Sequence, residues 1–260
     1  MTRKVIYDLG SNNGDDIPYY LMKCDLVVAV EANPMLCQQI REKFSDAIGE
    51  GRLVVENYVL ITGEIARQVQ EKGEVQVPFY IHLKNHVLSQ FPRPSASELS
   101  DFIEVALPSV SLIRLIGIHG APYYVKIDLE HFDNLILREL FENRIYPPYI
   151  SVESHHIDAF ASLIALGGYR AFKLVDGPSV ATRYRQHSIS TPQGTVNYSF
   201  PTHSAGPFGG DISGAWMSAD NFFGVLGIVG LGWKDIHATR VEEADPGYAP
   251  KPTFNLTIKY

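Results

Sequence analysis

The sequence predicts an α/β fold, in which a mainly parallel sheet carries helices on both faces. Two observations lead to this prediction. Short β-rich runs alternate with amphipathic segments of helical length along most of the chain. Runs such as "KVIYDL" and "DLVVAV" lack the alternation of half-exposed strands, as expected for strands covered on both faces. We found no internal repeat, so a single domain over residues 1–260 is predicted.

Proline and glycine bound the elements of the first half. Pro18 lies in the first turn of one predicted helix, and Pro34 starts the next, where a missing backbone N–H costs little. Gly49 and Gly51 end that second helix. The predicted elements are a strand at 4–9, a helix at 17–23, a strand at 26–31, a helix at 35–51 and a strand at 52–60.

The rest of the chain continues this alternation less regularly. Pro78 lies inside a β-rich run at 75–83 and favours an edge strand, because proline lacks a ladder donor. Ser218 or Asp220 caps a late helix, whereas 246–260 has no clear pattern. The other elements are a loop at 91–100, a strand and short helix within 102–120, strands at 123–131, 149–156, 169–176 and 233–241, and helices at 133–143, 157–168 and 218–232.

Residues 186–215 are rich in Ser, Thr, Pro and Gly. This composition predicts a long loop inserted in the domain, and long loops in compact domains are commonly functional. The first strand begins close to residue 1, so a lid over a site would have to come from elsewhere in the chain. We therefore expect 186–215 to serve as a lid or a substrate-binding segment.

Composition limits the class of partner. The net charge of −7 argues against the positive surface that a nucleic-acid backbone requires. No run approaches the 18 apolar residues of a membrane span, and no signal peptide precedes the first strand. The two cysteines form neither a metal motif nor a disulfide framework. A cytoplasmic protein is expected, without nucleic-acid or membrane partners and with a possible homo-oligomeric state.

Chemistry-bearing residues gather at the predicted strand ends, where parallel sheets bind ligands. The first strand ends in Asp8, and Gly10 and Gly14 in the turn "GSNNG" allow a sharp bend and close approach of a ligand. The second strand ends in Glu31. An acidic residue about 20 residues beyond a glycine turn commonly accepts both ribose hydroxyls of an adenosine. Asn57, after the third strand, carries an amide that can contact the adenine edge.

The spacing of the turn separates two cofactors. A dinucleotide fingerprint reads G-x-G-x-x-G, whereas this turn reads D-x-G-x-x-x-G. The third glycine of the fingerprint is replaced by Asp15 or Asp16. The negative charge of Asp8 suits a ligand with a cationic end, such as S-adenosylmethionine. An NAD-dependent oxidoreductase is the less favoured alternative.

Four segments together resemble the FkbM family of S-adenosylmethionine-dependent methyltransferases. They are "VIYDLGSNNG", "VVAVEANP", "YYVKIDLEHFDNLILREL" and "PPYISVESH". The family pattern is similar to V-D-V-G-A-N-x-G, F-E-P-N, K-I-D-V-E-G-x-E and a strand carrying Glu, in this order. The resemblance covers about residues 4–156, and the last strand fits as well. It implies the class I methyltransferase fold, which is Rossmann-like, with a seven-stranded, mostly parallel sheet and an antiparallel last strand.

The resemblance also implies a site for S-adenosylmethionine with a reaction centre beside it. Glu31 would hold the ribose, and Asn57 would lie near the adenine. Lys126, Asp128 and Glu130 would line the reaction centre. The predicted cofactor-binding residues are Asp8, Gly10, Ser11, Asn12, Gly14, Glu31, Ala32, Asn57 and Asp128.

Methyl transfer needs aligned reactants and an acceptor that loses its proton. Lys126, Asp128 and Glu130 share one parity along a strand end, so a regular strand would place them on one face. The lysine would keep carboxylates ionised or, with a lowered pKa, would itself accept a proton. Glu153 and His155 end the next strand, within reach of Asp128. These five residues are the predicted catalytic set.

Two features leave the mechanism open. Asp128, Glu153 and His155 are residue types that bind divalent ions, but their spacing is not diagnostic and no metal is predicted. His131 stands where the family has glycine, with Asp133 as the acidic residue that follows, so the turn is bulkier and His131 could contact substrate.

The favoured function is therefore O-methylation of a hydroxyl on a sugar or another small-molecule acceptor. A catalytically silent protein that binds S-adenosylmethionine and a partner is the main alternative, since His131 interrupts the family motif. N-methylation is a variant that would need less help from a base. Loops vary freely among proteins of one fold, so the sequence does not identify the acceptor.

Overall fold

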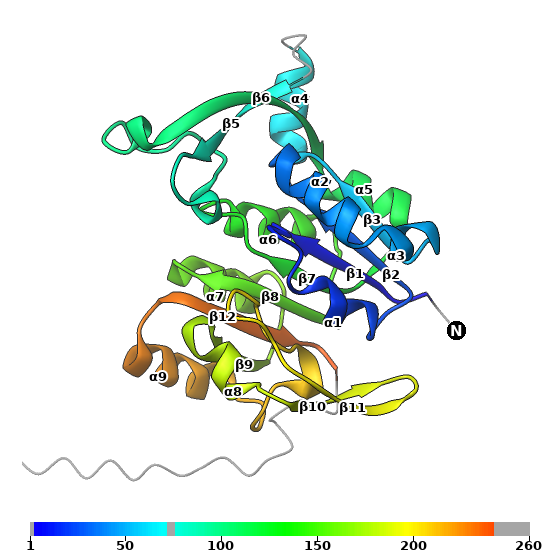
Figure 1. Ribbon diagram of the computed structural model, residues 1–260. Helices are drawn as coiled ribbons and strands as arrows, with labels where there is room; N and C mark the ends of the chain where they lie inside the picture. Colours follow the sequence, from blue (N-terminus) through cyan, green and yellow to red (C-terminus); the bar gives the residue numbers. More distant parts are fainter. Residues whose placement is uncertain (1–2, 72–75, 242–260) are drawn as a thin grey trace, which may run out of the picture.

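The computed structural model describes residues 3–71 and 76–241. Its centre is a seven-stranded sheet whose order along the sheet differs from the order along the chain (Figure 1). In spatial order the strands are β3 (Leu53–Glu56), β2 (Leu26–Val30), β1 (Val5–Leu9), β7 (Pro122–Ile127), β8 (Tyr149–Ser154), β12 (Gly232–Thr239) and β9 (Ala171–Asp176).

Only the last strand along the chain runs against its neighbours in this sheet, within the described residues. The pairs β1–β2, β2–β3, β1–β7 and β7–β8 are parallel, whereas β12 is antiparallel to both β8 and β9. The predicted seven-stranded sheet with a reversed last strand is thereby confirmed. The chain builds the sheet outward in one direction from β1 through β2 to β3, and in the other direction from β7 to β8. The ends of β1, β2 and β7 lie together near this switch in strand order, which is where parallel sheets bind ligands.

Helices cover both faces of the sheet, as predicted. Odd-numbered residues of β1, such as Tyr7, pack on one group of helices, and even-numbered ones, such as Ile6, pack on the other. The first face carries α5 (Leu112–His119), α6 (Asp133–Glu142), α7 (Ile157–Ala165) and α9 (Ala219–Val229). The second carries α1 (Ile17–Leu21), α2 (Pro34–Lys43), α3 (Ser45–Gly49) and α8 (Val180–Arg183).

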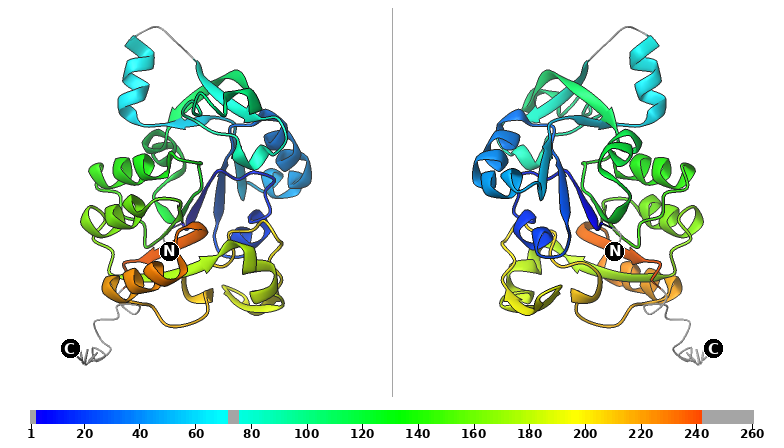
Figure 2. Two further views of the ribbon diagram at one scale, coloured as in Figure 1. Left: turned by 90° about the vertical axis from the view of Figure 1, so that its left-hand side faces the viewer. Right: turned by 90° about the vertical axis from the view of Figure 1, so that its right-hand side faces the viewer.

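A smaller lobe with its own core stands beyond the edge of the main sheet (Figure 2). It has three strands in the order β4 (Val59–Ile61), β6 (Phe102–Ser111) and β5 (Gln76–His82), together with α4 (Gly63–Glu71) and the short helices η1 (His86–Leu88) and η2 (Leu99–Asp101). β5 lies at the edge of this sheet, as Pro78 predicted. The prediction of one strand over 52–60 is wrong, because the chain leaves the main sheet after Glu56 and enters the lobe at Val59.

The prediction that 186–215 is one long loop is also wrong. The segment begins with a hairpin of β10 (His187–Thr191) and β11 (Gly194–Tyr198). It then runs across the second face of the sheet, where the Phe208 ring stacks on Tyr124 with ring centroids 4.1 Å apart. Polar residues and glycines predicted a loop, but the apolar Phe200, Phe208 and Ile212 between them are buried in the core. This segment therefore covers part of the second face of the sheet.

No helix of the described ranges is long and apolar enough to cross a membrane. Ser218 caps α9 by accepting a hydrogen bond from the backbone N–H of Asn221, which settles the choice between Ser218 and Asp220. The predicted tail at 246–260 lies outside the described residues.

Candidate functional site

Backbone hydrogen bonds to the end of β2 hold the turn after β1. The backbone N–H groups of Gly10 and Ser11 both donate to the carbonyl of Val30, at 2.9 and 3.1 Å. Gly10 and Asn12 have positive φ angles of 79° and 47°, a conformation that Gly and Asn adopt most readily. The turn is therefore a rigid platform at the end of the sheet, built by its own backbone hydrogen bonds.

Glu31 ties this platform to the start of α2. Its carboxylate accepts hydrogen bonds from the backbone N–H groups of Asn12 and Asn33, both at 2.8 Å. Burial raises the pKa of Glu31 to about 7, although these two donors act in the opposite direction. The Asn57 amide donates to the carbonyls of Glu31 and Ala32, at 3.0 and 2.8 Å. Each carboxylate oxygen of Glu31 has a second lone pair, so the group remains able to accept ligand hydroxyls.

Lys126 is buried next to the turn and pairs with two acids, the buried Asp8 and the partly exposed Asp128. Its Nζ is 3.1 Å from Asp128 Oδ2, 3.5 Å from Asp8 Oδ1 and 3.1 Å from the carbonyl oxygen of Gly10. Burial alone would lower the pKa of Lys126, but Asp128 and Asp8 raise it well above its ordinary value. The shift is opposite to the one that a proton acceptor needs. Lys126 therefore remains a cation that compensates the two carboxylates.

The carboxylate of Asp8 lacks hydrogen-bond partners. The residue is 1% exposed, and neither carboxylate oxygen accepts a hydrogen bond from the described residues. Burial raises its pKa, and Lys126 partly offsets that shift. A buried carboxylate with unused acceptor capacity favours a cationic or donor group on a ligand above it.

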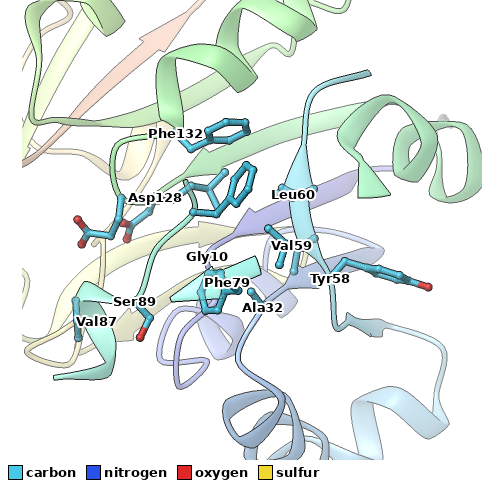
Figure 3. Close-up of a pocket in the computed structure, with 14 residues that line it drawn as sticks. Gly10, Ala32, Tyr58, Val59, Leu60, Phe79, Val87, Ser89, Asp128 and Phe132 are labelled. Carbon is cyan, nitrogen blue, oxygen red and sulfur yellow. The ribbon is translucent and has the colours of Figure 1, made fainter. Parts of the chain in front are cut away.

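A pocket opens at the ends of β1, β2 and β7, and Figure 3 shows Asp128 and Tyr58 on opposite sides of it. Its empty volume is about 490 Å³, including the part that opens to solvent. The main sheet and its loops contribute Gly10, Val30, Ala32, Asp128, Leu129, Glu130 and Phe132, and the smaller lobe and its approach contribute Tyr58, Val59, Leu60, Phe79, Val87, Ser89 and Phe91. One wall is mostly apolar and the other carries carboxylates, which suits a ligand with an aromatic part and a polar part.

The sequence reasoning did not find the wall formed by the smaller lobe. Phe79 on β5 and Phe91 after η1 face this pocket, and Phe91 also packs on Phe132 with ring centroids 5.2 Å apart. Both lie in the stretch that was assigned only as an edge strand and a loop. Side chains of the 79–91 stretch line this pocket, and none of 186–215 does among the described residues. The available signal was the aromatic residues of this stretch next to a loop that contains two prolines.

Glu130, Glu153 and His155 form a second group beside the pocket. His155 Nε2 lies 2.9 Å from Glu153 Oε2 and 3.8 Å from Glu130 Oε2. Burial raises the pKa of Glu130 to about 8, with a smaller contribution from Asp128, and it raises the pKa of Glu153 as well. The contact with Glu153 raises the pKa of His155 to about 9. Glu130 and His131 have successive positive φ angles of 44° and 67°, at the position where the resemblance expects glycine after the motif.

The predicted residues thus divide into four groups. Gly10, Ala32, Asp128 and Glu130 line the pocket. A further set does not line it but neighbours its lining residues in the chain or through hydrogen bonds and ion pairs. That set comprises Asp8, Asn12, Glu31, Asn57 and Lys126, whereas Glu153 and His155 line a smaller neighbouring cavity. Ser11 donates to the carbonyl of Asp8 and does not face the pocket, and a Cβ on Gly14 would lie 3.0 Å from Ile17 and Phe44. Ser11 and Gly14 therefore shape the turn from within.

Comparison with known proteins identifies similar folds but no family. No protein-family model matches the sequence, and no curated protein matches it. The fold resembles that of methyltransferase FkbM from Methylobacillus flagellatus KT, at 15% identity and a TM-score of 0.42, over 67% of this chain and 40% of that one. It also resembles spermidine synthase in complex with the transition state analogue AdoDATO, at 10% identity and a TM-score of 0.38, over 99% of this chain and 61% of that one. These values are too low to support an argument about function, which depends on the site itself.

Proposed function

We propose that this protein is an S-adenosylmethionine-dependent methyltransferase of the FkbM type that methylates a hydroxyl oxygen on a sugar or another small molecule. The observation that carries the proposal is the pocket at the ends of β1, β2 and β7. Glu31 and Asp8 lie at this end of the sheet with acceptor capacity to spare. The residues present therefore fit an adenosine-containing cofactor with a cationic end.

Each part of this cofactor would have a partner in the pocket or next to it. The ribose hydroxyls would donate to Glu31, whose carboxylate is fixed by the N–H groups of Asn12 and Asn33. The adenine would pack against the apolar wall of Val59 and Phe79. The amino group of the methionine part would face Asp8, and the developing loss of sulfonium charge would occur near Asp128.

The acceptor would enter beside Glu130. A hydroxyl oxygen is a weak nucleophile, so its proton must leave as the carbon–oxygen bond forms. The carboxylates of Asp128 and Glu130 line the same pocket as the cofactor platform. In this proposal they would orient the hydroxyl, and Asp128, or Glu130 in its ionised form, would receive the proton while the sulfonium transfers its methyl group in line.

Calorimetric titration of the purified chain tests the cofactor assignment. We expect S-adenosylmethionine and S-adenosylhomocysteine to bind with micromolar affinity and NAD to bind far more weakly. The Glu31→Ala variant should lose about 10- to 100-fold in affinity, because hydrogen bonds to a charged group contribute about 1.5–3 kcal/mol.

Glu56→Gln is a matched control for that experiment. Glu56 ends the neighbouring strand β3, but its carboxylate contacts His119 at 2.7 Å instead of the platform. The affinity of the Glu56→Gln variant for S-adenosylmethionine should equal that of the parent chain. Preferential binding of NAD, or binding of neither methyl-cofactor form by a folded chain, would overturn the proposal. Binding without methyl transfer to a broad panel of hydroxyl and amine acceptors would favour the catalytically silent alternative.

The affinity for S-adenosylmethionine should depend on pH through Glu31. Its raised pKa, about 7, means that the ionised form predominates only above that value. Ribose hydroxyls donate to the ionised form, so affinity should rise roughly tenfold between pH 6 and pH 8. The comparison is Glu31→Gln, for which the same titrations should give a flatter profile. An equally steep profile in that variant would assign the dependence to another group, such as Asp16.

A further inference from the structure

We propose that Glu130, Glu153 and His155 form a binding site for a divalent transition-metal ion such as Mn²⁺ or Zn²⁺. One ligand atom from each of the three residues lies within 4.8 Å of the other two. The three come from two neighbouring strand ends: Glu130 follows β7, and Glu153 and His155 lie at the end of β8. The site itself is independent of the proposed function, although its role in methyl transfer depends on it.

The interatomic distances suit shared coordination. Ligand atoms about 2.1 Å from one ion are separated by about 3.0–4.2 Å, depending on the angle between them. His155 Nε2 lies 2.9 Å from Glu153 Oε2 and 3.8 Å from Glu130 Oε2. The ring nitrogen is buried but makes no hydrogen bond among the described residues, so its close approach to Glu153 lacks the alignment of a hydrogen bond. An ion between the two would satisfy both atoms.

Charge and burial point to the same occupant. The side chains of Glu153 and Glu130 are only 8% and 13% exposed, and that of His155 is 29% exposed. In their ligating forms, two carboxylates and a neutral imidazole carry a charge of −2, which a divalent cation balances. Asp128 adds a further negative charge beside both glutamates. An imidazole among carboxylates favours Mn²⁺ or Zn²⁺ over Mg²⁺ or Ca²⁺.

The position explains what an ion would do there. Glu130 lines the cofactor pocket, whereas Glu153 and His155 line a smaller polar cavity that also includes His131 and Asp158. The group therefore lies between the two, within reach of a ligand in either. A hydroxyl oxygen bound to the ion would lose its proton more readily, so the ion would activate the acceptor that the proposed function requires.

Titration of the chelator-treated full chain with MnCl₂, without S-adenosylmethionine, tests the site. Calorimetry and the loss of the free Mn²⁺ paramagnetic-resonance signal should both report one saturable equivalent. Glu153→Gln and His155→Asn should each weaken binding at least tenfold, and Zn²⁺ should compete. His156→Ala is the matched control, since His156 is exposed next to His155 and lies outside the three-residue group, and its affinity should equal that of the parent.

The use of two variants distinguishes loss of metal binding from misfolding. Glu153 is buried, so its variant is to be checked by far-UV circular dichroism, whereas the partly exposed His155 should tolerate replacement. No saturable binding by the folded parent, or equal affinity in the parent and in folded His155→Asn, would show that these residues form a plain ion pair. Because no cofactor is present, failure here is distinct from failure of the methyltransferase proposal, which the S-adenosylmethionine titration reports.

Discussion

The Lys126→Met variant is expected to be less stable than the parent by about 3–5 kcal/mol at pH 8, the usual cost of removing one partner from a buried ion pair. Lys126 is 4% exposed, and its Nζ compensates Asp8 and Asp128 at 3.5 and 3.1 Å. Without it, Asp8 would be a buried carboxylate with neither an ion pair nor a hydrogen bond among the described residues. Urea unfolding followed by far-UV circular dichroism measures the change.

The loss should depend on pH with a definite sign. Burial already raises the pKa of Asp8, and it raises that of Asp16 to about 6, while Lys126 acts against both shifts. Removing Lys126 would raise both further. An acid whose pKa is higher in the folded than in the unfolded state lowers stability as pH rises through that folded value. The variant should therefore recover stability, relative to the parent, between pH 8 and pH 5.

Two further variants sharpen this test. Lys43→Met removes a lysine that is 50% exposed and lies 3.5 Å from Asp15, so its effect should stay within about 0.5 kcal/mol. Asp8→Asn combined with Lys126→Met should be more stable than Lys126→Met alone, because one uncompensated charge is gone. A loss under about 1 kcal/mol at pH 8, or a loss that grows on acidification, would contradict the role assigned to Lys126.

The buried sheet could be predicted from the sequence because its signals are local and strong. The runs that became β1, β2, β7 and β8 are mostly apolar and buried, and a chemically distinctive residue such as Asp8 or Glu153 lies at or near the end of each. Parallel strands share one carboxyl edge, so those residues had to meet. That reasoning brought Asp8, Glu31, Lys126 and Asp128 to one end of the sheet.

The smaller lobe could not be predicted in the same way. Nothing local in the run from Leu53 to Leu60 marks the point after Glu56 where the chain leaves one sheet for another. The assignment depends on the partners of β4 and β5, and both pair with β6, far along the chain. The apolar wall of the pocket was missed for this reason. The stretch 200–212 was wrongly predicted as a loop for a related reason. Its few buried aromatic residues stand among polar ones, so no local pattern shows that they belong to the core.

The ion pairs inside the site could not be predicted from the spacing of residues along the strand. Parity along one strand suggested that Lys126 would lie with Asp128 and Glu130. However, β7 ends at Ile127, and the positive φ of Glu130 turns that residue away. Lys126 instead pairs with Asp8 and Asp128, and Glu130 joins His155. The separation of these two groups is a property of the turn after β7, which no periodicity predicts.

The Gly10→Ala variant is expected to lose about 3–5 kcal/mol of stability and to lose cofactor binding with it. A Cβ on Gly10 would lie 1.8 Å from the carbonyl oxygen of Asp128, and the φ of 79° is unfavourable for any residue with a Cβ. Since both obstacles involve backbone, rotation of a side chain cannot relieve them. The end of β1 and the turn after β7 would have to separate, although the Asp128 N–H now donates to the carbonyl of Leu9 at 3.1 Å.

Gly117→Ala is the same chemical change, but it is expected to raise the stability of the chain. Gly117 lies inside α5, has open space around its would-be Cβ and has no positive φ, so alanine should stabilise the chain by about 0.5–1 kcal/mol. Thermal unfolding of both variants, with S-adenosylmethionine titrations on the folded fraction, separates stability from binding. If Gly10→Ala matched the parent in both, the close approach of the two strand ends would not be required. A loss in both would show that this glycine serves the contact between two backbones at the edge of the pocket, and that the contact holds Asp128 in place.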